Sequence, residues 1–337
     1  MGHRLPVYVK KIMIVLYILV LIVGFVGLVK GADLFVDGSA KIAGNLGVSG
    51  LIIGLTIVAL GTSAPELAVS TTAALQGSNE IALSNVVGSN IFNLLGVLGF
   101  CAILSPLPVD KSALKRDFPI SIANTILLLL LTCSGVLFSG EFTSHAMADN
   151  VGDVNRLTSG ILLVLFLCYI LYLIHTARKN PDEDPDRKKE PMKKCLLLLL
   201  IGVVLIIGGG QAVVYSAKKI ARFFGMTETL IGLTVVALGT SLPELVTSLV
   251  AAKKGETDLA IGNAIGSNIF NLMFILGISS MIHPIGVNMA SLCDMFILIG
   301  ISVMTLIFAS TSKKIGRLEG AVMVLVYAAD VVFAILR

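Results

Sequence analysis

The sequence predicts an all-α membrane protein with ten transmembrane helices in two inverted-topology five-helix repeats. Its 337 residues are 56% hydrophobic and only 14% charged, with a mean hydropathy of +0.95. Soluble domains carry about 25% charged residues, so this composition excludes an ordinary soluble domain. Apolar runs of the roughly 20 residues that a helix needs to cross a bilayer recur along the chain. The third observation is a long segment that occurs twice.

The duplicated segment has two blocks. GLTIVALGTSAPEL at Gly54–Leu67 returns as GLTVVALGTSLPEL at Gly232–Leu245, and GSNIFNL follows at Gly88–Leu94 and again at Gly266–Leu272. The offset is 178 residues throughout, and 28 of the 47 residues from position 53 to 99 are identical 178 places later. Such a repeat predicts two structurally equivalent halves.

Hydropathy places the expected spans at residues 10–35, 49–75, 79–105, 116–138, 157–177, 193–222, 228–253, 257–281, 291–310 and 316–336. The first half is expected at 1–178, with its repeat segment at 49–105, and the second at 193–337, with its repeat segment at 228–281. Residues 179–192 lie in a stretch rich in charge and proline that is too short for a folded domain, so we interpret them as a linker. The first apolar run lacks a small-residue cleavage site and is interpreted as part of a retained span.

The distribution of Lys and Arg gives an orientation. Of the 25 Lys and Arg residues, 17 lie in loops on the linker side of the predicted membrane. The positive-inside rule therefore predicts a cytoplasmic linker and both termini outside, in a multi-pass protein of the plasma membrane. Five spans per half is an odd number, so the second half must enter the membrane from the opposite side. Inverted repeats are typical of secondary transporters, whose substrate site lies near the midplane.

Glu66 and Glu244 are the first candidates for ion binding. A charged carboxylate at the bilayer centre costs about 2.5–3.5 kcal/mol on insertion scales. A lone protonated glutamate that only joins helices is the alternative, but two at equivalent positions, each after Thr-Ser-x-Pro, favour a functional site. Pro65 and Pro243 cannot donate to the carbonyl four residues back, so the helix should open there and free backbone oxygens. Irregular backbone at this depth is tolerated where it lines a cavity or is buried in protein.

The second block of each repeat adds neutral oxygens. Ser89 and Asn93 are four residues apart, on one helix face, as are Ser267 and Asn271. Hydrogen bonding between helices is an equally good interpretation of Asn90 and Asn268. Carboxylates, amides, hydroxyls and carbonyls are the ligands that Ca²⁺ and the alkali cations prefer. Two negative charges balance one Ca²⁺, or two or more monovalent cations or protons, which is a physical basis for antiport.

The remaining polar residues are expected to have less specific roles. The five cysteines lie singly in or beside apolar runs and are interpreted as small hydrophobic side chains. Local ion pairing is expected for Lys30, Asp33 and Asp37, and capping at the membrane interface for Asp117 and Asp294. Asp330, inside the last span, is an unassigned candidate.

The motifs GTSAPEL…GSNIFN and GTSLPEL…GSNIFN resemble the two α-repeats of the cation/calcium antiporter superfamily, in particular prokaryotic sodium/calcium exchangers and the related potassium-dependent branch. This resemblance covers essentially the whole chain and implies Na⁺-driven extrusion of Ca²⁺ by alternating access. It implies that Glu66, Glu244 and the carbonyls of Thr62 and Thr240 bind Ca²⁺. It also implies Na⁺ or site-lining roles for Ser63, Ser241, Ser89, Ser267, Asn93, Asn271 and the carbonyls of Ala59 and Ala237. Many members carry Asp where this chain has Asn271, which leaves the Na⁺:Ca²⁺ ratio and any K⁺ coupling open.

Together these observations predict a non-enzymatic transporter that uses no cofactor beyond the ions it carries, Ca²⁺ and Na⁺ with K⁺ possible. We expect it to function in the lipid bilayer as a monomer, without nucleic acid or a protein partner. Proton-coupled Ca²⁺ exchange is the alternative within the class, because glutamates can titrate, and a passive cation channel is a second alternative. The sequence has no Cys/His pair, Ser/Lys pair or paired-Asp arrangement at helix depth, which disfavours an intramembrane enzyme.

Overall fold

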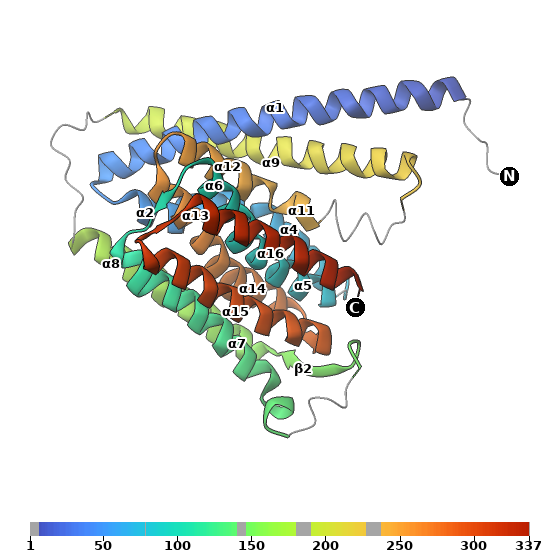
Figure 1. Cartoon of the computed structure of the whole chain (residues 1–337), viewed down its shortest axis with the longest axis vertical. Helices are drawn as coiled ribbons and strands as arrows, with labels where there is room; N and C mark the ends of the chain where they lie inside the picture. Colours follow the sequence, from blue (N-terminus) through green and yellow to red (C-terminus); the bar gives the residue numbers. More distant parts are fainter. Residues whose placement is uncertain (1–6, 78, 140–145, 180–189, 227–236, 337) are drawn as a thin grey trace.

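A computed structural model describes residues 7–77, 79–139, 146–179, 190–226 and 237–336, and most of these residues are helical (Figure 1). Among them, eight helices are long and apolar enough to cross a membrane, and a bent helix pair over residues 50–75 makes a ninth candidate span. The expected seventh span, 228–253, begins outside the described residues. The structure is therefore that of an integral membrane protein of α-helices.

The helical elements follow the predicted order in both halves. Those of the first half are α1 (Val7–Leu46), α2 (Gly50–Ile53), the π-helical η1 (Gly54–Val58), α3 (Ala59–Thr62), α4 (Ala64–Leu75), α5 (Asn79–Phe92), the π-helical η2 (Asn93–Val97), α6 (Leu98–Leu104), the π-helical η3 (Ala113–Asp117), α7 (Phe118–Ser139) and α8 (Arg156–Lys179). Those of the second half are α9 (Met192–Phe223), α11 (Ala237–Thr240), α12 (Leu242–Lys253), α13 (Thr257–Ile269), the π-helical η6 (Phe270–Ile275), α14 (Leu276–Ile282), α15 (Met289–Thr311) and α16 (Arg317–Leu336).

The predicted proline breaks are confirmed. The helix of residues 50–62 and α4 meet at an angle of 50°, with Ser63 at the bend. Pro65 stands in the first turn of α4, where its missing N–H would have no intrahelical partner anyway. Pro243 holds the same place in α12, and Ser241 separates that helix from α11. Each half therefore carries one broken helix with a glutamate directly after the break.

The first helices of the two halves, α1 and α9, lie side by side along one face of the bundle (Figure 1). Glycines bring their backbones together: a Cβ on Gly24 would lie 2.9 Å from Cβ of Ala212, and one on Gly38 would lie 2.8 Å from the backbone nitrogen of Leu199. As the chain advances along α1, its contacts move backwards along α9, so the helices run antiparallel. This is the direction that an inverted repeat requires of two equivalent spans.

Two short antiparallel ribbons join the halves away from the helix breaks. β1 (Leu107–Pro108) pairs with β4 (Lys314–Ile315), and β2 (Asn150–Val154) pairs with β3 (Ile285–Asn288). In each ribbon, the strand that follows the second repeat helix of one half pairs with a strand that precedes the last helix of the other half. The ribbons therefore tie the end of each repeat helix to the opposite half.

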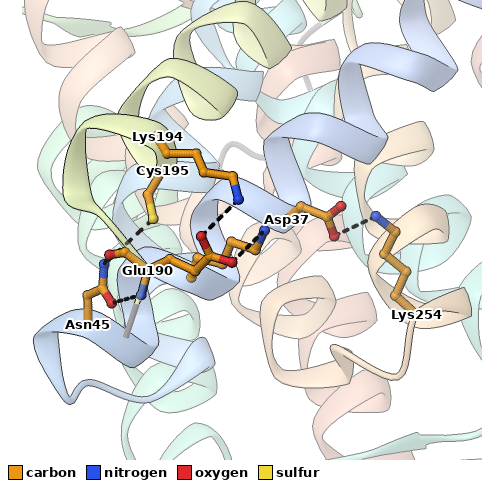
Figure 2. A network of polar contacts seen from close by, with 7 residues as sticks. Asp37, Asn45, Glu190, Lys194, Cys195 and Lys254 are labelled. Carbon is orange, nitrogen blue, oxygen red and sulfur yellow. Dashed lines mark hydrogen bonds and ion pairs between the residues drawn. The ribbon is translucent and has the colours of Figure 1, made fainter. Parts of the chain in front are cut away.

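Contacts near the expected cytoplasmic ends correct two expectations. Helix α1 continues to Leu46, well beyond the predicted end at residue 35. The carboxylates of Asp33 and Asp37 do not pair locally, because each lies 2.6 Å from the ammonium group of Lys254 in the second half. The helix extends because its last turns pack against that half, and Figure 2 shows the Asp37–Lys254 contact.

A second polar group anchors the start of α9 to α1 (Figure 2). The side-chain amide of Asn45 donates to the Glu190 carbonyl at 2.7 Å, and the Glu190 amide donates back to Asn45 Oδ1 at 3.1 Å. The Glu190 carboxylate pairs with Lys194 at 2.9 Å, and this contact lowers the pKa of Glu190. The end of the linker is thus held against the end of α1.

Asp117 is not an interfacial cap, which corrects another expectation. Its side chain is fully buried and accepts two hydrogen bonds from Arg116, at 2.7 and 2.9 Å. Tyr169 of α8 lies 3.5 Å from the same carboxylate. A buried charge needs such pairing, and the neighbouring arginine supplies it.

Candidate ion-binding site

Glu66 and Glu244 lie in the first turns of α4 and α12, and both side chains are fully buried. Each carboxylate is held by a serine from the break of the opposite half. The Ser63 hydroxyl donates to Glu244 Oε1 at 2.8 Å, and the Ser241 hydroxyl donates to Glu66 Oε1 at 2.9 Å. The halves thus exchange equivalent hydrogen bonds around one buried pair of carboxylates.

The two helix breaks favour a cation between them. The helical segments before the breaks end at Thr62 and Thr240, so the negative ends of these segments come four residues before Glu66 and Glu244 in the chain. The Thr62 hydroxyl lies beside the Glu244 carboxylate, and the Thr240 hydroxyl lies beside the Glu66 carboxylate. The predicted residues Thr62 and Thr240 thus lie close to the two carboxylates. Their role as carbonyl ligands stays a prediction.

Four asparagines form a second cross-half network at the next helices. Asn90 Nδ2 donates to the Asn268 carbonyl, and Asn268 Nδ2 donates to the Asn90 carbonyl, both at 3.2 Å. Asn93 Nδ2 donates to Asn268 Oδ1 at 3.1 Å, and Asn271 Nδ2 donates to Asn90 Oδ1 at 3.0 Å. Asn90 and Asn268 therefore join the helices, as one of the two interpretations of these residues predicted.

This network orients Asn93 and Asn271. Because each donates its amide nitrogen to the network, each leaves its Oδ1 as a buried oxygen without a hydrogen-bond partner among the described residues. The same holds for Oε2 of Glu66 and Oε2 of Glu244. These four buried oxygens, two from each half, and the Ser267 hydroxyl oxygen lack such a partner, so they are available as ligands for a cation.

Ser89 connects the two networks. Its Oγ lies 3.1 Å from Ser241 Oγ, which in turn donates to Glu66. Asn93 stands one helical turn beyond Ser89 on the same face, so the amide oxygen and the carboxylate share one region. In the other half, Ser267 lies beside the Glu244 carboxylate, and Asn271 stands one turn beyond it.

The predicted carbonyl positions are only partly described. The Ala59 carbonyl accepts from the Ser63 amide at 3.0 Å, and the Thr62 hydroxyl lies 3.4 Å from the same oxygen, so its predicted Na⁺ role stays a prediction. Ala237 begins α11, and its side chain lies outside the described residues. Asp330 lies on α16 near Tyr327 and stays unassigned.

Sequence reasoning missed two residues behind the carboxylates. Asn263 Nδ2 donates to the Glu244 carbonyl at 3.3 Å and to Ser248 Oγ at 2.9 Å, and its Oδ1 lies 2.9 Å from the Thr62 hydroxyl. Asn85 likewise donates to the Glu66 carbonyl at 3.5 Å and to Ser70 at 3.0 Å. The repeat could have identified these residues, because Asn85 and Asn263 are the same residue type at the 178-residue offset. The same holds for Ser70 and Ser248.

The π-helical segments were also missed. Asn93 begins η2, and Asn271 is the second residue of η6. A π-helical turn shifts the hydrogen bonds of the backbone to i→i+5 and often occurs at functional sites. No sequence rule used above distinguishes such a turn from an ordinary helix.

The ligand chemistry is therefore hard oxygen throughout. Among the residues that the structure describes, no group of three or more His, Cys, Asp or Glu side chains gathers into a metal cluster. Two carboxylates, two amide oxygens and several hydroxyls suit Ca²⁺ or alkali cations. A membrane-spanning helical bundle with such a site between two equivalent halves defines a cation transporter.

Comparison with known proteins gives the family. The family described as "Sodium/calcium exchanger protein" matches residues 16–175 and 194–336. The sodium/calcium exchanger MaX1 of Methanosarcina acetivorans is 34% identical, over 95% of this chain and 99% of that protein. The putative antiporter CaxA of Alkalimonas amylolytica is 38% identical, over 91% of this chain and 94% of that protein. A solved structure of the sodium-calcium exchanger NCX_Mj superposes with a TM-score of 0.80 at 31% identity, covering 95% of this chain and 99% of that one. The chain belongs to the sodium/calcium exchanger family.

Proposed function

We propose that this protein is a secondary active antiporter that exchanges Ca²⁺ for Na⁺ by alternating access and normally extrudes Ca²⁺. The observation that carries the proposal is the reciprocal pair of Ser–Glu hydrogen bonds at 2.8 and 2.9 Å. Because each carboxylate is held by the opposite half, a movement of one half against the other changes both sides of the site together. The relatives named as exchangers and antiporters support the same activity.

The proposal includes the architecture predicted from the sequence. Ten spans form two inverted halves, the linker is cytoplasmic, and both termini lie outside. The antiparallel packing of α1 and α9 supports the inversion, because these helices open the two halves. We propose that the protein acts as a monomer in the bilayer, with K⁺ as a further possible ion.

The test is ⁴⁵Ca²⁺ uptake into liposomes that contain the purified full-length protein. Liposomes loaded with Na⁺ and diluted into Na⁺-free buffer should accumulate Ca²⁺. Glu66→Gln and Glu244→Gln should each abolish uptake, because each removes one of the two charges that balance Ca²⁺. Glu190→Gln makes the same chemical change at a partly exposed position of the linker and should retain uptake. Wild-type transport in either buried variant would overturn the assignment of the site.

The same liposomes distinguish the coupling ion. Proton-coupled exchange is the second candidate, because Glu66 and Glu244 are fully buried carboxylates that either protons or cations can neutralise. Uptake driven by a pH gradient in Na⁺-free buffer would assign the coupling to protons. Flux with no counter-ion gradient that also dissipates imposed gradients would indicate a channel and would overturn antiport.

A further inference from the structure

We propose that the ribbon of β1 and β4 is a binding site for the headgroup of an anionic phospholipid, held by basic side chains from both halves of the protein. The inference goes beyond the proposed antiport and does not depend on the coupling ion. It is carried by the position, the charge and the apolar surroundings of this ribbon.

The ribbon lies at one end of the helix bundle. In Figure 1 the connection from α15 to α16, which contains β4, lies at the end of the bundle where α8 ends and α9 begins, whereas β2 lies toward the opposite end. Pro108 of β1 pairs with Lys314 of β4, and the Val109 amide donates to the Lys313 carbonyl at 2.9 Å. These contacts place the two lysines of the second half beside the residues that follow β1 in the first half.

Exposed basic residues gather at this ribbon, two after β1 and three around β4. They are Lys111, Lys115, Lys313, Lys314 and Arg317. Within the part of the chain that the structure describes, none of the five forms an ion pair. The carboxylates of Asp110 and Glu319 accept instead from the backbone amides of Ser112 and Gly316. Five positive charges against these two negative ones leave a net charge of +3 that has no partner within the ribbon.

The other ribbon shows that the fold does not require these charges. Lys314 of β4 stands three residues before Arg317, the first residue of α16. In the β2–β3 ribbon, Asp153 stands three residues before Arg156, the first residue of α8. Residues 149–156 and 283–289, which contain that ribbon, carry two aspartates and one arginine. The same strand pairing thus occurs without a basic cluster, so the cluster has a separate cause.

Exposed apolar side chains stand next to the basic ones. Leu318, directly after Arg317, is 79% exposed, and Leu104 at the end of α6, which packs against α16, is 48% exposed. In a bilayer such side chains contact acyl chains, so the neighbouring basic groups lie at the level of the headgroups. Lys and Arg at this level attract anionic lipids, and the phosphate and acyl chains of one lipid satisfy both kinds of surface. A soluble phosphate would contact the basic groups alone, which favours a lipid as the ligand.

The test measures binding of dioleoyl phosphatidylglycerol to the purified full-length protein in a neutral detergent. Native mass spectrometry counts the bound lipid, and the unfolding temperature over a range of lipid concentrations gives the affinity, because a ligand of the folded state stabilises it. Phosphatidylglycerol should bind more tightly than dioleoyl phosphatidylcholine, and the difference should shrink as ionic strength rises. Equal binding of the two lipids would overturn the inference, as would equal stabilisation by soluble glycerol phosphate.

Paired substitutions locate the binding site. Lys313→Gln with Lys314→Gln should weaken phosphatidylglycerol binding about 30-fold, at roughly fivefold for each lost charge. Lys179→Gln with Lys193→Gln removes two exposed charges at the end of α8 and the start of α9, at the same end of the bundle, and should leave binding nearly unchanged. Lys313→Arg with Lys314→Arg keeps the charge and should bind like the wild type, which separates a lost charge from a disturbed ribbon.

Two outcomes of these substitutions would contradict the site. Unchanged binding after Lys313→Gln with Lys314→Gln would show that the ribbon does not hold the lipid. Equal weakening by both glutamine pairs would show that the lysines act only as general surface charge, as a signal for membrane orientation requires. Either result would leave the proposed antiport untouched, because no residue of the ion-binding site is changed.

Discussion

The polar contacts of the two halves are equivalent at the centre of the molecule but not at the expected cytoplasmic ends of the helices. At the centre, Ser63 and Ser241 make the same bond to opposite glutamates, at 2.8 and 2.9 Å. At the helix ends, Lys254 bridges Asp33 and Asp37, but the residues 178 positions away from these three are Gln76, Gln211 and Tyr215, none of them charged. The chemistry is therefore duplicated at the candidate ion-binding site, and the charges differ where Lys254 holds one half against the other.

This difference separates two requirements. A site between the two halves that opens to both membrane faces is formed by equivalent groups from each half. The contacts of Lys254 with Asp33 and Asp37 stabilise the arrangement of the halves seen in this structure. Paired substitutions at equivalent positions can test each requirement.

The largest effect in this comparison is expected at the serines. Ser63→Ala and Ser241→Ala each remove the hydrogen bond to a buried carboxylate, which costs about 1–3 kcal/mol. We expect the half-saturating Ca²⁺ concentration to rise roughly tenfold in both variants, by a similar factor. Initial rates of ⁴⁵Ca²⁺ uptake over a range of Ca²⁺ concentrations measure it. A large effect in one variant alone would show that the site is asymmetric after all.

The asparagines behind the carboxylates should give unequal effects. Asn263 is fully buried and contacts Thr62 across the halves at 2.9 Å, whereas Asn85 is only half-buried. We therefore expect Asn263→Ala to slow transport and lower stability by about 1–3 kcal/mol, and Asn85→Ala to have the smaller effect. Uptake rates and the unfolding temperature in detergent measure both. Equal losses would mean that the difference in burial between the two asparagines has no effect.

The smallest effect is expected at the helix ends. Lys254→Gln installs the residue that the first half has at the equivalent position, Gln76. The side chains of Asp33 and Asp37 are 42% and 46% exposed, so solvent screens the pairing, and we expect a loss of no more than about 1 kcal/mol. The half-saturating Ca²⁺ concentration should stay unchanged, and the effect on turnover should shrink as ionic strength rises. Abolished transport would place Lys254 in the machinery of exchange itself.

Much of the site could be predicted because the repeat marks it twice. Glu66 and Glu244 stood out as carboxylates in apolar runs, and the breaks at Pro65 and Pro243 follow from the missing N–H of proline. Asn85 and Asn263 carried the same repeat signal and were overlooked, because their side chains support the backbone behind the glutamates and do not stand next to them in sequence.

Other features were beyond the sequence. The π-helical turns at Asn93 and Asn271 depend on how the next helices pack, and no residue pattern distinguishes them from α-helix. The pairing of Asp33 and Asp37 with Lys254 joins residues more than 200 positions apart. From the sequence alone, we expected these aspartates to pair with residues close to them in the chain, because a sequence does not show which distant residues become neighbours in the fold.

By itself, the sequence determined the membrane class, the duplication, the positions of the helix breaks and the oxygen chemistry of the site. These follow from local properties: the transfer cost of polar groups, the geometry of proline and the identity of residues at a fixed offset. The tertiary structure decided which half supplies the partner of each carboxylate and which atoms of Asn93 and Asn271 are left for an ion. Those choices depend on hydrogen bonds between helices that are far apart in the chain, and only packing brings these helices together.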